Sequence, residues 1–127
     1  MHDIGRVVNP TTARSQVEGG VLQALGFALS EERFVDRATG RVMNANLENY
    51  KVPTVKDVPA KITVKFVDRP DRRANNLGIK GLGEPPIIPT AAAIANAVAN
   101  ATGARVRHAP LTRARVLEAL AIAEARG

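Results

Sequence analysis

Cysteine is absent from all 127 residues. Disulfides, cysteine-ligated zinc and iron–sulfur clusters are therefore excluded within this chain. Its apolar runs are all far shorter than the ~20 residues that a membrane-spanning helix needs. The chain does not open with the basic segment and apolar stretch of a secretory signal. From the sequence we therefore expect no membrane association and a cytoplasmic location.

Aromatic side chains are also scarce, at 3% of the chain, although the formal net charge is +6. Proteins that bind single-stranded nucleic acid place aromatic rings, on which bases stack, among their basic residues. The basic residues here are instead scattered, with local clusters only near Arg72 and Arg107. We therefore expect no nucleic-acid partner. The charge leaves an alternative function open, a basic non-catalytic binding module for an acidic protein or nucleic acid.

The remaining composition is globular, with 45% apolar and 24% charged residues, and this length suits a single domain over residues 1–127. Caps, alternation and glycine turns predict its helices and strands. The expected elements are a helix at Pro10–Ser30, a hairpin of Glu32–Asp36 and Arg41–Ala45, a strand in 60–68, a helix from Pro89 to Gly103, a short strand in 104–110 and a helix after Thr112. This order predicts an α+β fold with helices packed on a small mixed sheet.

One narrow face of the first helix is rich in glycine. At 100° per residue this face carries Gln16, Gly19, Gly20, Gln23 and Gly26. A glycine inside a helix costs ~1 kcal/mol relative to alanine, so something is expected to approach this backbone closely. Tight packing against another element explains the glycines, and a hydrogen-bonding ligand explains the two amides as well. The residues alone leave both interpretations open.

The segment "NNLGIKGLGEPPIIP" is a loop built around one carboxylate, Glu84. Its glycines let a bulky group lie against the backbone, and the two prolines that follow Glu84 stiffen the chain. The loop therefore predicts a carboxylate held on a rigid arm before a helix. The alternative is a rigid turn with a solvent-exposed glutamate. Lys80 is expected to contact a phosphate or to pair with Glu84.

Three blocks of sequence now point to a family. They are "DIGRVVNP", "SQVEGGVLQALGFALSEE" and "KGLGEPP", and they occur in the family's order along nearly the whole chain. The chain resembles the C-terminal part of the molybdopterin-binding (large) subunit of the xanthine dehydrogenase and aldehyde oxidase family. The resemblance implies that the fold is part of the second molybdopterin-binding domain of a molybdenum hydroxylase. The family's subunit is several times longer than this chain.

The resemblance also implies roles for individual residues. Glu84 matches the family's general base beside the molybdenum, in a reaction that hydroxylates an aldehyde or N-heterocycle carbon with oxygen from water. Five further residues match or adjoin positions that face the pterin cofactor: Gln16, Gly19, Gly20, Lys80 and Gly83. No residue of this chain is expected to ligate the metal.

The same resemblance implies partners. The molybdenum–molybdopterin cofactor is expected to bind only together with the remainder of the subunit, so the chain alone is expected to be inactive. Iron–sulfur clusters and FAD belong to partner domains or subunits, in keeping with the absence of cysteine. A small-molecule substrate is the remaining expected partner. Apolar surface left uncovered by the remainder is expected to drive self-association into a homo-oligomer.

Overall fold

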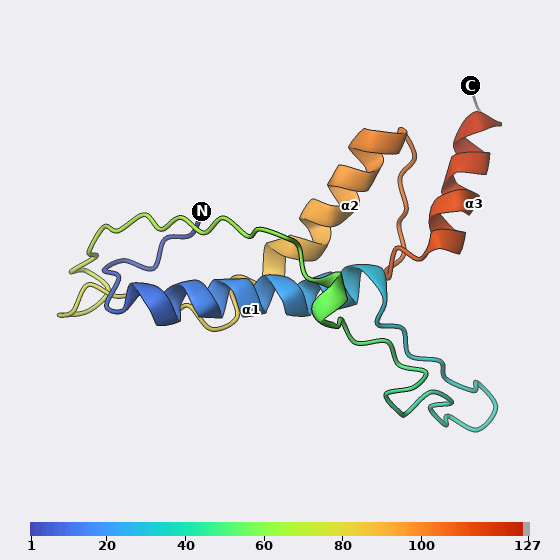
Figure 1. Ribbon diagram of the computed structural model, residues 1–127, viewed down its shortest axis with the longest axis horizontal. Coiled ribbons are helices and arrows are strands. Elements are labelled where there is room, and N and C mark those ends of the chain that lie inside the picture. Colours follow the sequence, from blue (N-terminus) through green and yellow to red (C-terminus); the bar gives the residue numbers. More distant parts are fainter. Residues whose placement is uncertain (126–127) are drawn as a thin grey trace.

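The computed structural model describes residues 1–125 and is built around three α-helices. They are α1 (Pro10–Leu29), α2 (Ile88–Thr102) and α3 (Arg113–Glu124), with one 3₁₀ helix, η1, at Val55–Asp57. Figure 1 shows an open, branched arrangement in which α1 is the long central rod. The helices α2 and α3 stand on one side of α1, and the chain between α1 and η1 projects on the other. Among residues 1–125, no helix is long and apolar enough to cross a bilayer.

The start of α1 follows from its capping sequence. The Asn9 side chain accepts hydrogen bonds from the backbone N–H groups of Thr11 and Thr12, at 3.0 and 3.1 Å. Pro10 occupies the first helical position, where a missing N–H costs nothing. At the other end the carbonyl of Gly26 accepts the N–H groups of Ser30 and Glu31. The predicted helix is confirmed to within one residue.

The two later helices are also confirmed. Gly103 ends α2 in the left-handed conformation, with φ of 71°, as glycine commonly does at a helix end. Thr112 caps α3 by accepting the N–H of Arg115. The α2 helix packs on α1. The segment before α3 is tied to the end of α1, because the N–H of Leu111 donates to the carbonyl of Ala28 at 2.6 Å.

The predicted small mixed sheet is not found in residues 1–125 and has to be corrected. Three isolated bridges stand in its place: His2 with Phe66, Gly5 with Ile79, and Val35 with Val42. The expected hairpin is a turn closed by a few backbone bonds around the last of these bridges, without regular strands. The segment 104–110 is likewise irregular. Within the described residues the α+β prediction becomes three helices joined by extended segments.

The segment 61–67 shows why the sheet was predicted. Ile62, Val64 and Phe66 are half-buried while Lys61 and Lys65 are exposed, so the alternation gave the two faces correctly. However, within residues 1–125 only the carbonyl of Lys65 and the N–H of Val67 pair with another segment, both with His2 at 3.0 Å. Alternation reports which side chains face inward, but it does not report whether a second strand lies alongside.

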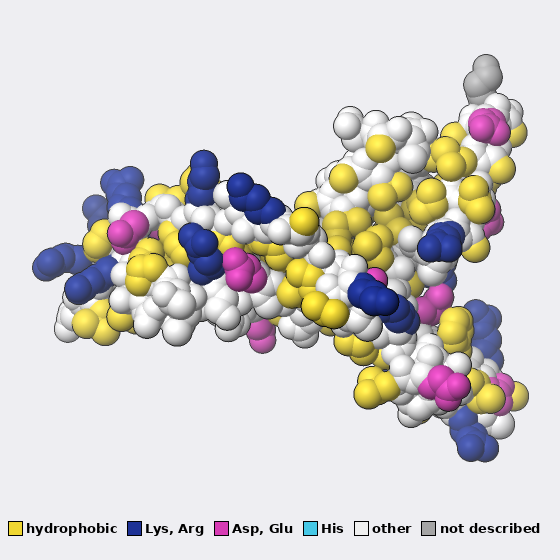
Figure 2. Space-filling view, viewed as in Figure 1, with side chains coloured by type: hydrophobic (Ala, Val, Ile, Leu, Met, Phe, Trp, Pro, Cys, Tyr) yellow, Lys and Arg dark blue, Asp and Glu magenta, His cyan; other side chains and the backbone are white. Residues whose placement is uncertain are grey.

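The buried core of the described residues is small. Its apolar members are Ile4, Ala13, Ala24, Ala28, Ala104 and Leu111. Large apolar side chains lie mainly at the surface; Leu47 is 84% exposed and Leu117 is 66% exposed. Figure 2 shows apolar side chains gathered at the surface between α2 and α3. This is the kind of surface that the predicted self-association, or a covering partner, would bury.

Candidate functional site

The structure brings Gln16 and the Glu84 loop together. The Gln16 side chain donates from Nε2 to the carbonyl oxygen of Gly83 at 3.1 Å, across 67 residues of sequence. Glu84 follows directly, and its own carbonyl accepts the N–H of Ile87 at 2.9 Å in the turn that leads into α2. The Glu84 side chain is exposed. Within residues 1–125 its carboxylate has no hydrogen-bond or ion-pair partner.

The glycines of α1 divide into two kinds. A Cβ atom placed on Gly20 would lie 2.8 Å from the Cβ of Pro86, and one on Gly26 would lie 2.8 Å from the Cδ of Pro53. Real Cβ atoms do not approach that closely, so both glycines are required by tight packing against the rest of this chain. For Gly20 and Gly26 the packing interpretation is confirmed.

Gly19 and the loop glycines are different. A Cβ atom on Gly19, Gly81 or Gly83 would meet no heavy atom within 4 Å. None of the three has a left-handed backbone conformation, so the described chain itself does not require glycine there. Gln16 and Gly19 are three residues apart in the helix and share one face, and both are exposed. This face of α1 is therefore open to a further group.

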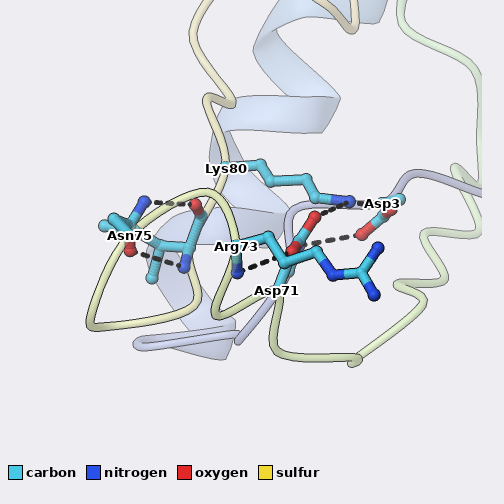
Figure 3. A network of polar contacts seen from close by, with 7 residues as sticks. Asp3, Asp71, Arg73, Asn75 and Lys80 are labelled. Atoms are coloured by element: carbon cyan, nitrogen blue, oxygen red, sulfur yellow. Dashed lines mark hydrogen bonds and ion pairs between the residues drawn. The ribbon is translucent and has the colours of Figure 1, made fainter.

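Lys80 lies within an ion-pair network rather than beside Glu84. Figure 3 shows its ammonium group between two carboxylates, with Nζ 2.6 Å from Oδ2 of Asp3 and 3.4 Å from Oδ2 of Asp71. The predicted pairing of Lys80 with Glu84 is therefore wrong. Asp3 and Asp71 were not identified from the sequence. The sequence suggested that Lys80 has an anionic partner, but only the folded chain shows that the partners are Asp3 and Asp71.

The network changes the acidity of its members. The hydrogen bond from Lys80, reinforced by the N–H of Gly5, holds the pKa of Asp3 below its ordinary value of 3.8. The same bond raises the pKa of Lys80. Because the folded-state pKa of Asp3 is depressed, its stabilising contribution is present above pH 3.8 and is lost as the pH falls through the lower folded value.

A shallow cleft of about 410 Å³ adjoins both Gln16 and Lys80. Residues from 4–13 and from 79–82 form its remaining walls. The cleft is open to solvent, so a ligand that lies in it would be enclosed only if another part of the protein covered it. Among residues 1–125, no group of three or more histidine, aspartate or glutamate side chains is placed to hold a metal ion.

These observations test whether the residues fit a flat, polar cofactor such as a pterin. The amide of Gln16, the uncrowded backbone of Gly19 and Gly83 and the exposed carboxylate of Glu84 fit such a group, because each leaves space or hydrogen-bonding capacity for it. Two predicted contacts fit less well. Gly20 is covered by Pro86, and the Lys80 ammonium is already held by two carboxylates.

Comparison with known proteins gives consistent matches. The family model described as "Molybdopterin cofactor-binding domain" matches residues 1–59. The chain is 46% identical over 118 residues to the putative xanthine dehydrogenase molybdenum-binding subunit XdhA of Escherichia coli, covering 93% of this chain and 15% of that protein. It is 45% identical over 116 residues to the aldehyde oxidoreductase molybdenum-binding subunit PaoC of Escherichia coli, covering 91% of this chain and 16% of that protein.

Solved structures match over the same extent. Quinoline 2-oxidoreductase from Pseudomonas putida 86 superposes with a TM-score of 0.83 at 31% identity, covering 94% of this chain and 15% of that one. The aldehyde oxidoreductase from Desulfovibrio desulfuricans gives a TM-score of 0.80 at 36% identity, covering 92% of this chain and 12% of that one.

Residues 1–59, which include α1, thus match a molybdopterin cofactor-binding domain, and the fold of the chain is similar to part of a solved quinoline 2-oxidoreductase. The resemblance seen in the sequence motifs is confirmed: the chain corresponds to part of the molybdenum-binding subunit of the xanthine dehydrogenase and aldehyde oxidase family. It spans about 15% of the length of the curated relatives named above.

Proposed function

We propose that this chain supplies the catalytic base and part of the pterin site of a molybdenum hydroxylase that acts on an aldehyde or an N-heterocycle. The observation that carries the proposal is the hydrogen bond from Gln16 to Gly83, which joins the predicted pterin-facing helix to the predicted base. The names of the relatives, which include an aldehyde oxidoreductase subunit and a xanthine dehydrogenase subunit, support the same reaction class.

In this proposal each residue has a defined task. The bound molybdenum cofactor supplies the two-electron oxidation and activates water as the nucleophile. The Glu84 carboxylate accepts the proton of that water on one of its Oε atoms, which the absence of a partner within the described chain leaves free. Gln16 uses Nε2 to hold the loop and has Oε1 left to accept a hydrogen bond from the pterin. Gly19 and Gly83 leave room for the ring system.

The remaining parts of the enzyme lie outside this chain. Because the chain spans about 15% of its relatives, most cofactor contacts and the substrate pocket come from the rest of the subunit. Iron–sulfur clusters and FAD are assigned to partner domains or subunits. Residues 1–127 act as one unit of the second molybdopterin-binding domain and have no turnover alone.

The origin of the product oxygen tests this function. The assembled enzyme, given an N-heterocycle in ¹⁸O-labelled water, is expected to place one ¹⁸O atom in the hydroxylated product. Mass spectrometry of the product measures the label. A parallel reaction in ordinary water under ¹⁸O₂ is the control and is expected to give unlabelled product. Label that came from O₂, or no hydroxylation of either substrate class, would contradict the proposed function.

A further inference from the structure

We propose that Lys80 is a positioning residue that anchors the loop segment 80–86, here called the arm, which carries Glu84. Lys80 does not bind the cofactor in this proposal. This inference rests on the proposed function, because it concerns the placement of the proposed base. It starts from the three segments that meet at Lys80: the N-terminal segment at Asp3, the turn at Asp71 and the glycine loop itself.

The two carboxylates are oriented before they meet the lysine. Asp3 accepts the N–H of Gly5 on Oδ1 at 2.9 Å, and Asp71 accepts the N–H of Arg73 on Oδ1 at 3.1 Å. Each therefore presents its other oxygen, Oδ2, to the Lys80 ammonium (Figure 3). Their orientation by the backbone makes this a defined site for one cation rather than a chance surface contact.

The backbone at the same place is also closely fixed. The N–H of Lys80 donates to the carbonyl of Ile4, and the N–H of Arg6 donates to the carbonyl of Gly78, both at 2.8 Å. A Cβ atom on Gly5 would lie only 2.2 Å from the oxygen of Gly78. The N-terminal segment thus crosses the loop backbone to backbone, and the lysine side chain ties down the same crossing.

The far end of the arm is held by different contacts. Gln16 donates to the carbonyl of Gly83, and Pro86 packs against Gly20 of α1. Only Gly81 and Leu82 lie between the two holding points. Glu84 lies between Gly83 and Pro86, the two residues held at this far end, so releasing the near end at Lys80 would let its carboxylate shift without unfolding a helix.

Stability alone does not account for this arrangement. The side chains of Lys80 and Asp3 are 35% and 45% exposed, and exposed ion pairs usually add little to folding stability. We therefore expect the ion pairs of Lys80 to affect the position of the loop that carries Glu84 more than the folding stability. A catalytic base that is misplaced by about 1 Å can lose about 10²-fold in rate.

The test uses Lys80→Met in the assembled enzyme, which removes the charged amine and keeps an unbranched side chain only one heavy atom shorter. The expected result is unchanged molybdenum content, unchanged KM and a kcat lower by about 10- to 100-fold. Hydrogen–deuterium exchange is expected to rise in peptides that contain the N–H groups of Arg6 and Lys80. Lys80→Arg is expected to restore both kcat and exchange. Lys51→Met removes a comparable exposed ion pair, with Asp57 at 2.7 Å, and is expected to change neither.

A double variant separates positioning from a general structural role. If Lys80 acts through Glu84, Lys80→Met together with Glu84→Gln is expected to be no slower than Glu84→Gln alone. Loss of molybdenum in Lys80→Met would overturn the inference in favour of a cofactor contact. Unchanged exchange, or a rate loss that adds to that of Glu84→Gln, would also overturn it. Retained turnover in the single variant Glu84→Gln would count against the proposed function itself, whatever the result for Lys80→Met.

Discussion

Replacing Glu84 by glutamine is expected to lower the turnover of the assembled enzyme by about 10²- to 10⁴-fold, the range that general-base catalysis contributes. Glutamine keeps the size and polarity of the side chain but cannot accept the proton at neutral pH. The carboxylate of Glu84 has no partner within residues 1–125, so the change leaves no buried charge unpaired. The fold and the bound molybdenum are therefore expected to persist. Steady-state kinetics and elemental analysis of the same preparation measure both.

Glu48 provides the matched control, because it is an exposed glutamate in the chain between α1 and η1, outside the candidate site. Glu48→Gln is expected to leave turnover unchanged. If Glu84→Gln also keeps its turnover, Glu84 is not the base. If Glu84→Gln loses its molybdenum, the residue holds the cofactor instead, and the assignment of its role is wrong.

Alanine is expected to be more favourable for stability at Gly19 than at Gly20. Gly19→Ala should raise the free energy of unfolding by about 1 kcal/mol, since a Cβ there meets nothing and alanine favours the helix. Gly20→Ala has the same helical gain but must push Pro86 away from α1, and overpacking typically costs about 1–3 kcal/mol. The expected difference between the two variants is therefore about 1–3 kcal/mol.

Denaturant unfolding of the purified chain, followed by helical circular dichroism, measures this difference. Equal stability of the two variants would contradict the close packing of the loop on α1. In the assembled enzyme Gly19→Ala is expected to lower molybdenum occupancy, because its methyl group would fill the space assigned to the pterin. Full occupancy in that variant would remove Gly19 from the proposed site.

The helices could be predicted from the sequence because their signals are local. Asn9 and Pro10 start α1, Gly103 ends α2 and Thr112 starts α3, each through contacts with residues a few positions away. The sheet could not be predicted reliably, because pairing depends on distant segments. The alternation in 61–67 correctly gave one half-buried face, yet among the described residues only His2 pairs with that segment.

The site shows the same division. The sequence singled out Gln16 and Glu84, and the structure connects them through Gly83. The sequence alone could not show that Gly19 is uncovered while Gly20 is packed, because that difference depends on the position of Pro86. The partner Asp3 of Lys80 was missed because it lies 77 residues away in sequence.

The amount of molybdenum bound per chain decides whether this chain forms part of a molybdenum hydroxylase. Material purified gently from the native host, as the assembled complex, is analysed by elemental mass spectrometry together with identification of the co-purifying polypeptides. About one molybdenum is expected for each copy of this segment, with the rest of the molybdenum-binding subunit present in the same complex. A complex that contains this segment but no molybdenum would contradict the claim that it forms part of a molybdenum hydroxylase.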